Sequence, residues 1–297
     1  MTDASTIWRT ALQTLRQNGR IALADWPADT IAPEQLGLKA EGAFLSMPER
    51  VRLYDEGYLD GQLKQVDATA TLRLFDAVDS TNTAMIRDAQ THGVGGHIYV
   101  AEFQTAGRGR RGRDWIGDFG RNVAMTVGFS FQRQLSDLGG LSCVAGLALI
   151  QVLENLGVKA QLKWPNDVWF EDKKLAGILV ELIQTPRGAS AVIGIGMTVD
   201  LSPEQTSMID QAVVGLRALD VAIAREDLVV AIYDALSVNL TFFAQEGFAR
   251  FVPAFDAVHR LHDSSAVLSS GNTKREGKVR GVDQDGALLF EENGSIS

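Results

Sequence analysis

Apolar and polar positions alternate with two different periods along the chain, and this pattern predicts a mixed α and β fold. Near the start, apolar residues recur at helical spacing from Ile7 to Leu15, and Asn18-Gly19 ends the pattern. A short strand is predicted at 21–24 and a second helix at 48–63. These short elements predict an N-terminal appendage in front of the main domain.

The middle of the chain has the longer elements of a packed domain. Strands are predicted where apolar residues alternate or run together, at 71–75, 97–102, 122–131, 160–163, 168–170, 175–183 and 191–197. Helices are predicted at 83–90, 139–156, 226–245 and 249–258. Strand 122–131 has one large apolar face and one face of small residues. The small face gives room for a ligand or another backbone to approach.

The last part of the chain has short strands separated by glycine-containing turns. The strands are predicted at 266–268, 278–282 and 287–291, with Asp283–Gly286 as a hairpin turn. Short strands separated by such turns predict a small β-barrel. The chain therefore divides into an N-terminal segment (1–65), a central domain (66–258) and a C-terminal unit (259–297), in the α+β class.

Composition narrows the class of protein. A net charge of -9 and a pI near 5.0 argue against a protein devoted to nucleic acid. The single cysteine, Cys143, excludes an internal disulfide and fits a reducing, cytoplasmic compartment. No signal peptide is predicted, and no apolar run approaches the roughly 20 residues of a membrane span. The four histidines and Cys143 lack metal-ligand spacing, so we expect no metal held by the protein alone.

The strongest chemical signal is the segment Gly107–Arg113, with four arginines and three glycines in seven residues. Arginine stays charged and presents a planar fork of donors that suits phosphate oxygens. Glycine lets the backbone approach a ligand closely. The segment therefore predicts a loop that binds a phosphate-bearing ligand and is poorly ordered without one. On charge alone, a solvated basic surface loop is an equal alternative.

Two other polar clusters flank this loop in the sequence. Asp79-Ser80-Thr81-Asn82 precedes a predicted helix, and four short polar side chains exceed what one helix cap needs, so a polar pocket is predicted there. Lys163 to Asp167 follows a short strand, and Lys173-Lys174 lies in a turn. Trp164 and Pro165 are expected to pack and set the turn, and Trp169 to lie in the core or a groove wall.

Five motifs occur in one order: DSTN (79–82), EFQTAGRGRRGRDW (102–115), KWPNDV (163–168), KKLAGILVE (173–181) and VIGIGM (192–197). Together they closely resemble the biotin protein ligases (biotin–acetyl-CoA-carboxylase ligases). The resemblance covers about residues 40–297. It implies a class II synthetase-like core, a central mixed sheet with flanking helices, and an SH3-like C-terminal barrel.

The resemblance also implies a two-step reaction. Biotin and ATP, with Mg²⁺, give biotinyl-5′-AMP and pyrophosphate. A lysine of the biotin carboxyl carrier protein of acetyl-CoA carboxylase then takes up the biotin. Members of the family often form homodimers through the central sheet, whereas the sequence by itself leaves the oligomeric state open.

Residue roles follow from the resemblance, position by position. The expected catalytic cations are Lys174, Arg108 and Arg110. The expected biotin contacts are Ser80, Thr81, Asn82, Gln104, Arg108, Gly109, Arg110, Lys174, Gly177 and Gly194. The expected nucleotide contacts are Trp115, Lys163, Asn166, Asp167 and Arg113. Gly194 and Gly196 are expected to let the ligand lie against a strand, and Arg111 and Arg113 to matter less than Arg108 and Arg110.

Three features depart from the family pattern. Thr198 stands where the family often has Asn. The chain stops at Ser297, where the family usually adds a strand that closes the barrel, so either an open-edged unit or an incomplete sequence is expected. Residues 5–19 resemble the recognition helix of a winged helix-turn-helix, but the helices that precede it in that module are absent. We therefore expect a cover for the ligase core rather than DNA binding.

Two other functions remain as alternatives. A lipoate–protein ligase shares the same core architecture, although the Arg/Gly loop with KWPND and KLAGILVE favours biotin. A repressor without catalysis is the alternative from another class, but a DNA-binding protein needs neither the Arg/Gly loop nor Lys174.

Overall fold

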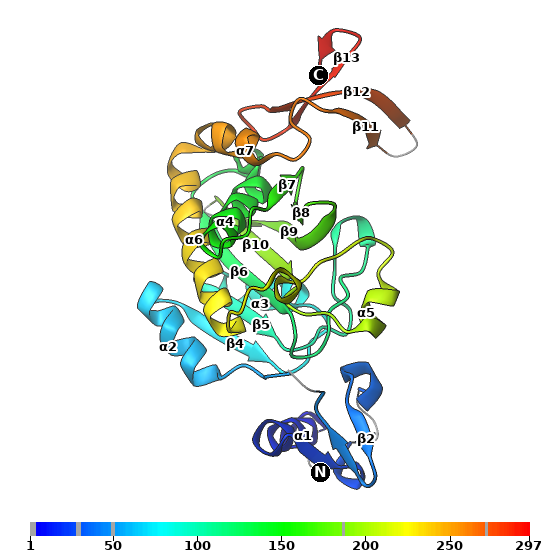
Figure 1. The fold of residues 1–297 in the computed structure, drawn as a ribbon. Coiled ribbons are helices and arrows are strands. Elements are labelled where there is room, and N and C mark those ends of the chain that lie inside the picture. The colour runs from blue at the N-terminus through cyan, green and yellow to red at the C-terminus, as the bar shows by residue number, and fades with distance from the viewer. Residues whose placement is uncertain (1–3, 28–30, 49–50, 186–187, 271–272) are drawn as a thin grey trace.

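The computed structural model describes residues 4–27, 31–48, 51–185, 188–270 and 273–297. Three sheets follow one another along the chain, and helices pack around the largest of them (Figure 1). The N-terminal elements and the C-terminal strands lie at opposite ends of this central layer. The predicted α+β class with a central mixed sheet is confirmed. The predicted boundaries at 65/66 and 258/259 stay predictions.

The central sheet has seven strands in the order β4-β5-β6-β10-β9-β8-β7. Their bounds are β4 (Thr71–Phe75), β5 (His97–Ala101), β6 (Val123–Phe131), β7 (Gln161–Lys163), β8 (Asp167–Phe170), β9 (Lys173–Thr185) and β10 (Gly188–Met197). Only the β4–β5 pair is parallel, and the other neighbours are antiparallel. The long strands β9, β10 and β6 lie at the centre, and their two faces have different roles.

One face of the sheet carries the core. The helices on it are α2 (Glu56–Val66), α4 (Leu141–Asn155) and α6 (Arg225–Glu246), and they cover the large side chains of β6, such as Val123, Met125 and Val127. Cys143 of α4 is buried, and burial raises the pKa of its thiol to about 12. It is a core residue, as expected, and stays in the unreactive thiol form.

Two helical stretches, 135–155 and 225–246, are long and apolar enough by length and composition to cross a bilayer, so the expectation that no stretch comes near a membrane span was too strong. The second includes all of α6. Both are core helices here, because α4 and α6 pack on each other and on the sheet. Their apolar character is explained by burial in the protein interior.

The opposite face of the sheet is covered only in part. Helix α3 (Thr81–His92) packs Met85 against Tyr99 and Val192 of the sheet. Short helix α5 (Pro203–Met208) lies further along, in the segment after β10. Between them this face is lined by small residues, and the candidate site lies there.

The N-terminal segment is a helix followed by a small sheet. Helix α1 (Ala4–Asn18) is followed by β1 (Arg20–Ala22), β2 (Lys39–Glu41) and β3 (Phe44–Ser46), in the order β1-β3-β2. The sequence pattern missed β2 and β3, since each has three residues. The helix predicted from 48 begins at Glu56, because the Asp55 side chain accepts the Tyr58 N–H and caps it; residues 49–50 lie outside the described ranges.

The C-terminal unit is an antiparallel sheet of four strands, β11 (Ser265–Ser270), β12 (Thr273–Val282), β13 (Leu288–Glu292) and β14 (Ser295–Ile296), in that order, and α7 (Val252–Val258) precedes it. The predicted turn at Asp283–Gly286 is present. Among the described residues β11 and β14 do not pair, so the sheet is open-edged, as expected, and not a closed barrel. Trp164 donates its indole N–H to the Gly286 carbonyl at 3.0 Å and ties this unit to the core.

A buried carboxylate, Glu102, joins the N-terminal segment to the core. Its side chain is fully buried and accepts hydrogen bonds from the Tyr54 backbone N–H at 2.5 Å and from Arg225 at 2.7 Å. Arg16 of α1 lies 3.4 Å from it and also pairs with Asp76 at 2.6 Å. Because Glu102 directly follows β5, the N-terminal helix contacts the segment that leads from β5 toward the Arg/Gly loop.

We predict unequal losses of stability when these arginines are replaced. Arg225→Met leaves the buried Glu102 carboxylate without its main counter-charge, so the free energy of unfolding should fall by about 3–5 kcal/mol. Arg16→Met removes a more exposed partner and should cost about 1 kcal/mol. Urea unfolding of both variants measures the difference, and equal losses would contradict this account of Glu102.

The buried imidazole of His259 predicts a pH dependence of stability. Both ring nitrogens lack a hydrogen-bond partner among the described residues. Burial, and next the neighbouring His262, lower the pKa of His259 from 6.5 to about 4. Below pH 6.5 the unfolded chain therefore binds a proton that the folded chain refuses. Stability should fall as the pH drops from about 6.5 to about 4, by on the order of 1–2 kcal/mol.

Thermal unfolding of the natural chain and His259→Leu across this pH range checks the prediction. Carboxylates elsewhere titrate in both proteins, so the informative quantity is the difference between the two curves. The stability of His259→Leu relative to the natural chain should rise as the pH falls. A constant difference would remove His259 as its source.

Candidate active site

The site is built on glycines in the two central strands. Gly177 of β9 pairs with Gly196 of β10, and both face the side of the sheet opposite the core helices. A Cβ atom on Gly196 would lie 2.3 Å from the Trp115 ring, and one on Gly194 would lie 2.2 Å from Asn82 Oδ1. Side chains of the protein thus lie over Gly194 and Gly196, and a ligand contact with these glycines stays a prediction.

Above these glycines lies a cavity of about 630 Å³. Its walls come from the turn before α3, the Arg/Gly loop, β8, β9, β10 and the segment 208–213. The predicted residues that line it are Ser80, Thr81, Asn82, Gln104, Arg108, Gly109, Arg110, Arg113, Trp115, Asn166, Asp167, Lys174, Gly177 and Gly194. The fold therefore brings five separate motifs to one place.

One end of the cavity is lined mainly by uncharged polar side chains. The Thr81 backbone N–H, at the start of α3, donates to Gln104 Oε1 at 2.8 Å, and the Thr81 hydroxyl lies 3.2 Å from the same oxygen. Gln104 therefore caps the helix, and the Ser80 side chain does not. With Oε1 occupied, the Gln104 NH₂ group remains as the donor available to a ligand.

Asn82 is held in one orientation by its neighbours. Its Nδ2 donates to the Leu179 carbonyl at 3.2 Å and to Glu181 Oε2 at 3.0 Å, and its Oδ1 accepts from the Thr126 hydroxyl at 2.7 Å. Both amide hydrogens are thus used within the protein. Only the second lone pair of Oδ1 is left to accept a hydrogen bond from a ligand.

The Arg/Gly loop is folded over the cavity. The Gly109 N–H donates to the Arg113 carbonyl at 2.7 Å, and the Trp115 N–H donates to the Gly107 carbonyl at 2.8 Å. Gly107 has no room for a side chain, because a Cβ would lie 2.4 Å from the Trp115 carbonyl oxygen. These contacts place Trp115 on Gly196. Disorder of the loop without a ligand stays a prediction.

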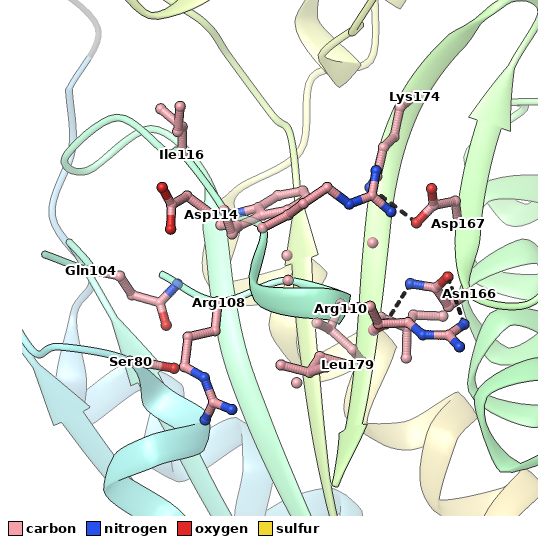
Figure 2. Close-up of a pocket in the computed structure, with 18 of the residues that line it drawn as sticks. Ser80, Gln104, Arg108, Arg110, Asp114, Ile116, Asn166, Asp167, Lys174 and Leu179 are labelled. Carbon is pink, nitrogen blue, oxygen red and sulfur yellow. Dashed lines mark hydrogen bonds and ion pairs between the residues drawn. The ribbon is translucent and has the colours of Figure 1, made fainter. Parts of the chain in front are cut away.

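Arg108 and Arg110 of the loop point to different sides of the cavity (Figure 2). Arg108 extends toward the side of Ser80 and Gln104, and its guanidinium pairs with Glu181 at 2.8 Å. Arg110 extends to the other side, where it donates to Asn166 Oδ1 at 3.2 Å. The loop therefore places one arginine at each end of the cavity, and Glu181 balances the charge of Arg108.

Lys174 supplies the third cation. Its ammonium lies 3.0 Å from Asp167 Oδ1 and 5.6 Å from the Trp115 ring centroid, and its side chain is only 12% exposed. The backbone around it is also fixed, since Lys174 N–H donates to the Ala212 carbonyl and Val214 N–H donates to the Lys174 carbonyl. A lysine in an open turn would be solvated, whereas this one is held at the cavity wall.

Lys163 is the one predicted site residue that the structure does not bring to the cavity. Its ammonium lies 4.5 Å from the centroid of the Trp169 ring, and Arg260 lies over the same ring at 5.4 Å. Lys163 precedes Asn166 by three residues, but the turn between β7 and β8 directs the two side chains to different places. Its nucleotide role stays a prediction without support from this geometry.

The sequence pattern missed several residues of the site. In the sequence, Glu181 is one polar position in an amphipathic strand and Thr126 is one small residue on a strand face, so neither stands out as a site residue. Met208, Ile209 and Val213 belong to a segment without regular alternation, yet they line the cavity. The position of Thr126 opposite Gly194 could have been found from the register of two glycine-containing strands.

The comparisons with known proteins agree with this geometry. Residues 74–198 match the model of the "Biotin/lipoate A/B protein ligase family". The chain is 32% identical over 276 residues to the bifunctional ligase/repressor BirA of Escherichia coli, covering 92% of this chain and 82% of the relative. It is 36% identical over 184 residues to the biotin–[acetyl-CoA-carboxylase] ligase of Mycobacterium tuberculosis, covering 56% and 67%.

Among solved structures, the biotin protein ligase from Aquifex aeolicus in complex with biotin and ATP superposes with a TM-score of 0.64 at 26% identity, over 76% of this chain and 94% of that one. The identity to BirA over most of both chains and the shared fold establish the family. The chain belongs to the biotin protein ligases.

Proposed function

We propose that this protein is an ATP-dependent biotin–protein ligase. It activates biotin as biotinyl-5′-AMP and transfers the biotin to a lysine of the biotin carboxyl carrier protein of acetyl-CoA carboxylase. The observation that carries the proposal is a single cavity that joins an end lined mainly by uncharged polar side chains to a cationic part with Arg110 and Lys174. Ligases with these names in other organisms, and an ATP- and biotin-bound relative, support the same reaction.

The end lined by Ser80, Asn82 and Gln104 suits the head of biotin. A ureido group has two N–H donors and one carbonyl acceptor. Asn82 Oδ1 has a free lone pair for an N–H donor, and the Gln104 NH₂ group is free to donate to a carbonyl. The Ser80 hydroxyl, at the same end, can donate or accept a hydrogen bond. Because neighbours fix Asn82 and Gln104, the head is bound by groups already in position.

The cationic part suits the attack of a carboxylate on a phosphate. The biotin carboxylate oxygen attacks the α-phosphorus of ATP, the bond to the β-phosphate oxygen breaks, and pyrophosphate leaves. Two anions must approach each other, so fixed positive charges lower the barrier. Lys174 is held beside Asp167 and Arg110 is held by Asn166, so both charges are in place before the ligands meet.

The residues present also fit Mg²⁺. The ion usually binds one or two carboxylates together with nucleotide phosphates. Asp167 offers a carboxylate next to Asn166, and no group of three acidic, histidine or cysteine side chains in the described ranges could hold a metal by itself. Asp167 would hold the ion against the phosphates, where Mg²⁺ supplies charge neutralisation.

In the second step, the acceptor lysine attacks the carbonyl of the mixed anhydride and AMP leaves. The anhydride hydrolyses easily, so water must be kept out until the acceptor arrives. Trp115, seated on Gly177 and Gly196, and the loop above it form the cover. Loop residue Arg110 can hold the phosphate and so keep the cover closed.

The N-terminal segment has no part in the proposed reaction. Arg16 points to Asp76 and Glu102 of the core, which supports its role as a cover rather than as a DNA reader. DNA binding, a homodimer and a cytoplasmic location stay predictions. Lipoate remains the alternative acyl substrate, and the following experiment decides between them.

Pyrophosphate release tests the proposed function. The purified chain is mixed with ATP and Mg²⁺ and either biotin or lipoate, and radiolabelled acyl transfer to an isolated carrier domain is followed in parallel. We expect pyrophosphate and labelled carrier with biotin. Faster turnover with lipoate would reassign the acyl substrate, and no reaction with either would reject the ligase.

We predict that Arg110→Ala leaves the fold intact while the intermediate escapes faster. The side chain is part of a loop that packs little apolar surface, so the melting temperature should stay nearly unchanged. Loss of one charge-assisted contact to the phosphate should speed release of biotinyl-5′-AMP by about ten- to a hundredfold. Filter retention of labelled intermediate measures the rate. Arg111→Ala, on an exposed residue of the same loop, is the matched control.

A further inference from the structure

Glu181 is a carboxylate on the cavity face of the sheet that the proposed reaction leaves unused. It lies on β9 two residues beyond Leu179, so both side chains are on the same face as Gly177. Its side chain is 24% exposed. A negative charge near a site for a carboxylate and phosphates would repel the ligands unless it is paired, so its partners determine what it does.

The first partner is Arg108. The guanidinium contacts both carboxylate oxygens, with Nη2 2.8 Å from Oε1 and Nη1 3.3 Å from Oε2. Nη1 also donates to the Thr83 hydroxyl at 3.2 Å. This paired geometry fixes the plane of the guanidinium as well as its position. Since the Arg108 side chain is 45% exposed, the pair adds little to folding stability.

The second partner is Asn82. Glu181 Oε2 accepts one Nδ2 hydrogen at 3.0 Å, and the Leu179 carbonyl accepts the other. An amide with two occupied donors cannot flip without losing both bonds. The orientation that leaves Asn82 Oδ1 toward the cavity therefore depends on Glu181.

We propose that Glu181 is a positioning residue that links the Arg108 arm of the loop to Asn82 at the head-group end of the cavity. This inference rests on the proposed ligase function. Through one carboxylate, the loop is anchored to the same side chain that faces the head of the acyl substrate. Glu181 touches neither substrate in this account, and it acts by fixing Arg108 and Asn82.

The first test needs no ligand. Trypsin cleaves after arginine, and the loop contains four, so the cleavage rate in the ligand-free protein reports how often the loop opens. Glu181→Ala should speed cleavage within 107–113 by about fivefold, located by mass spectrometry, as expected for the loss of one ion pair. Asp172→Asn, which breaks another carboxylate–arginine pair just before β9, is the matched control and should change nothing.

A double-mutant cycle shows whether Arg108 carries the effect. In an Arg108→Ala background, Glu181→Ala should add no further cleavage, because the anchor has already gone. If the effects of the two substitutions on the cleavage rate multiply, Glu181 acts through a partner other than Arg108. Equal cleavage rates in the natural chain and Glu181→Ala would overturn the proposal. Unchanged melting temperatures exclude general unfolding as the cause.

Enzyme kinetics test the Asn82 arm. Glu181→Gln keeps an acceptor for Asn82 but loses the charge that holds Arg108, so KM for biotin should stay within about twofold while the adenylate escapes about fivefold faster. Glu181→Ala should also raise KM for biotin by about tenfold. An unchanged KM in Glu181→Ala would overturn the Asn82 link. If the natural chain has no ligase activity but the trypsin result is as expected, the proposed function is rejected, whereas the role of Glu181 in anchoring the loop is retained.

Discussion

The site depends on the absence of side chains at the centre of the sheet. Gly177, Gly194 and Gly196 lie on adjacent strands, and any Cβ at Gly194 or Gly196 would overlap Asn82 or the Trp115 ring. The indole can therefore lie against the backbone, and the Arg/Gly loop that carries it comes close enough to close the cavity. The same sheet buries its other face under α4 and α6, so the floor of the site is held rigidly by the core.

This floor places the charges. Within a chain of net charge -9, several cations line one cavity, and three of them are each held by an oxygen of the protein: Arg108 by Glu181, Arg110 by Asn166 and Lys174 by Asp167. Like charges this close would repel if they were free, so the paired oxygens keep the site stable while it is empty. Anionic ligands then compete for cations that are already oriented.

The sequence predicted most of the sheet and most of the cavity lining, because long alternating strands and contiguous motifs are local signals. It failed where position depends on packing in space. Lys163 shares a motif with Asn166, but the turn directs it to Trp169. Glu181 was missed because its partners are far away in sequence, and the 208–213 segment because it has no periodicity. Helix α2 begins later than predicted, because Asp55 and not Pro48 marks its start.

The backbone bridge between Lys174 and Ala212–Val214 has a consequence for how such enzymes diverge. These hydrogen bonds fix the candidate cation relative to the 212–214 segment of the cavity wall, although nearly forty positions separate them in the chain. An insertion or deletion after α5 would shift the register of this bridge and move the ammonium with it. The irregular stretch after α5 is thus under stricter geometric constraint than its loop-like composition suggests.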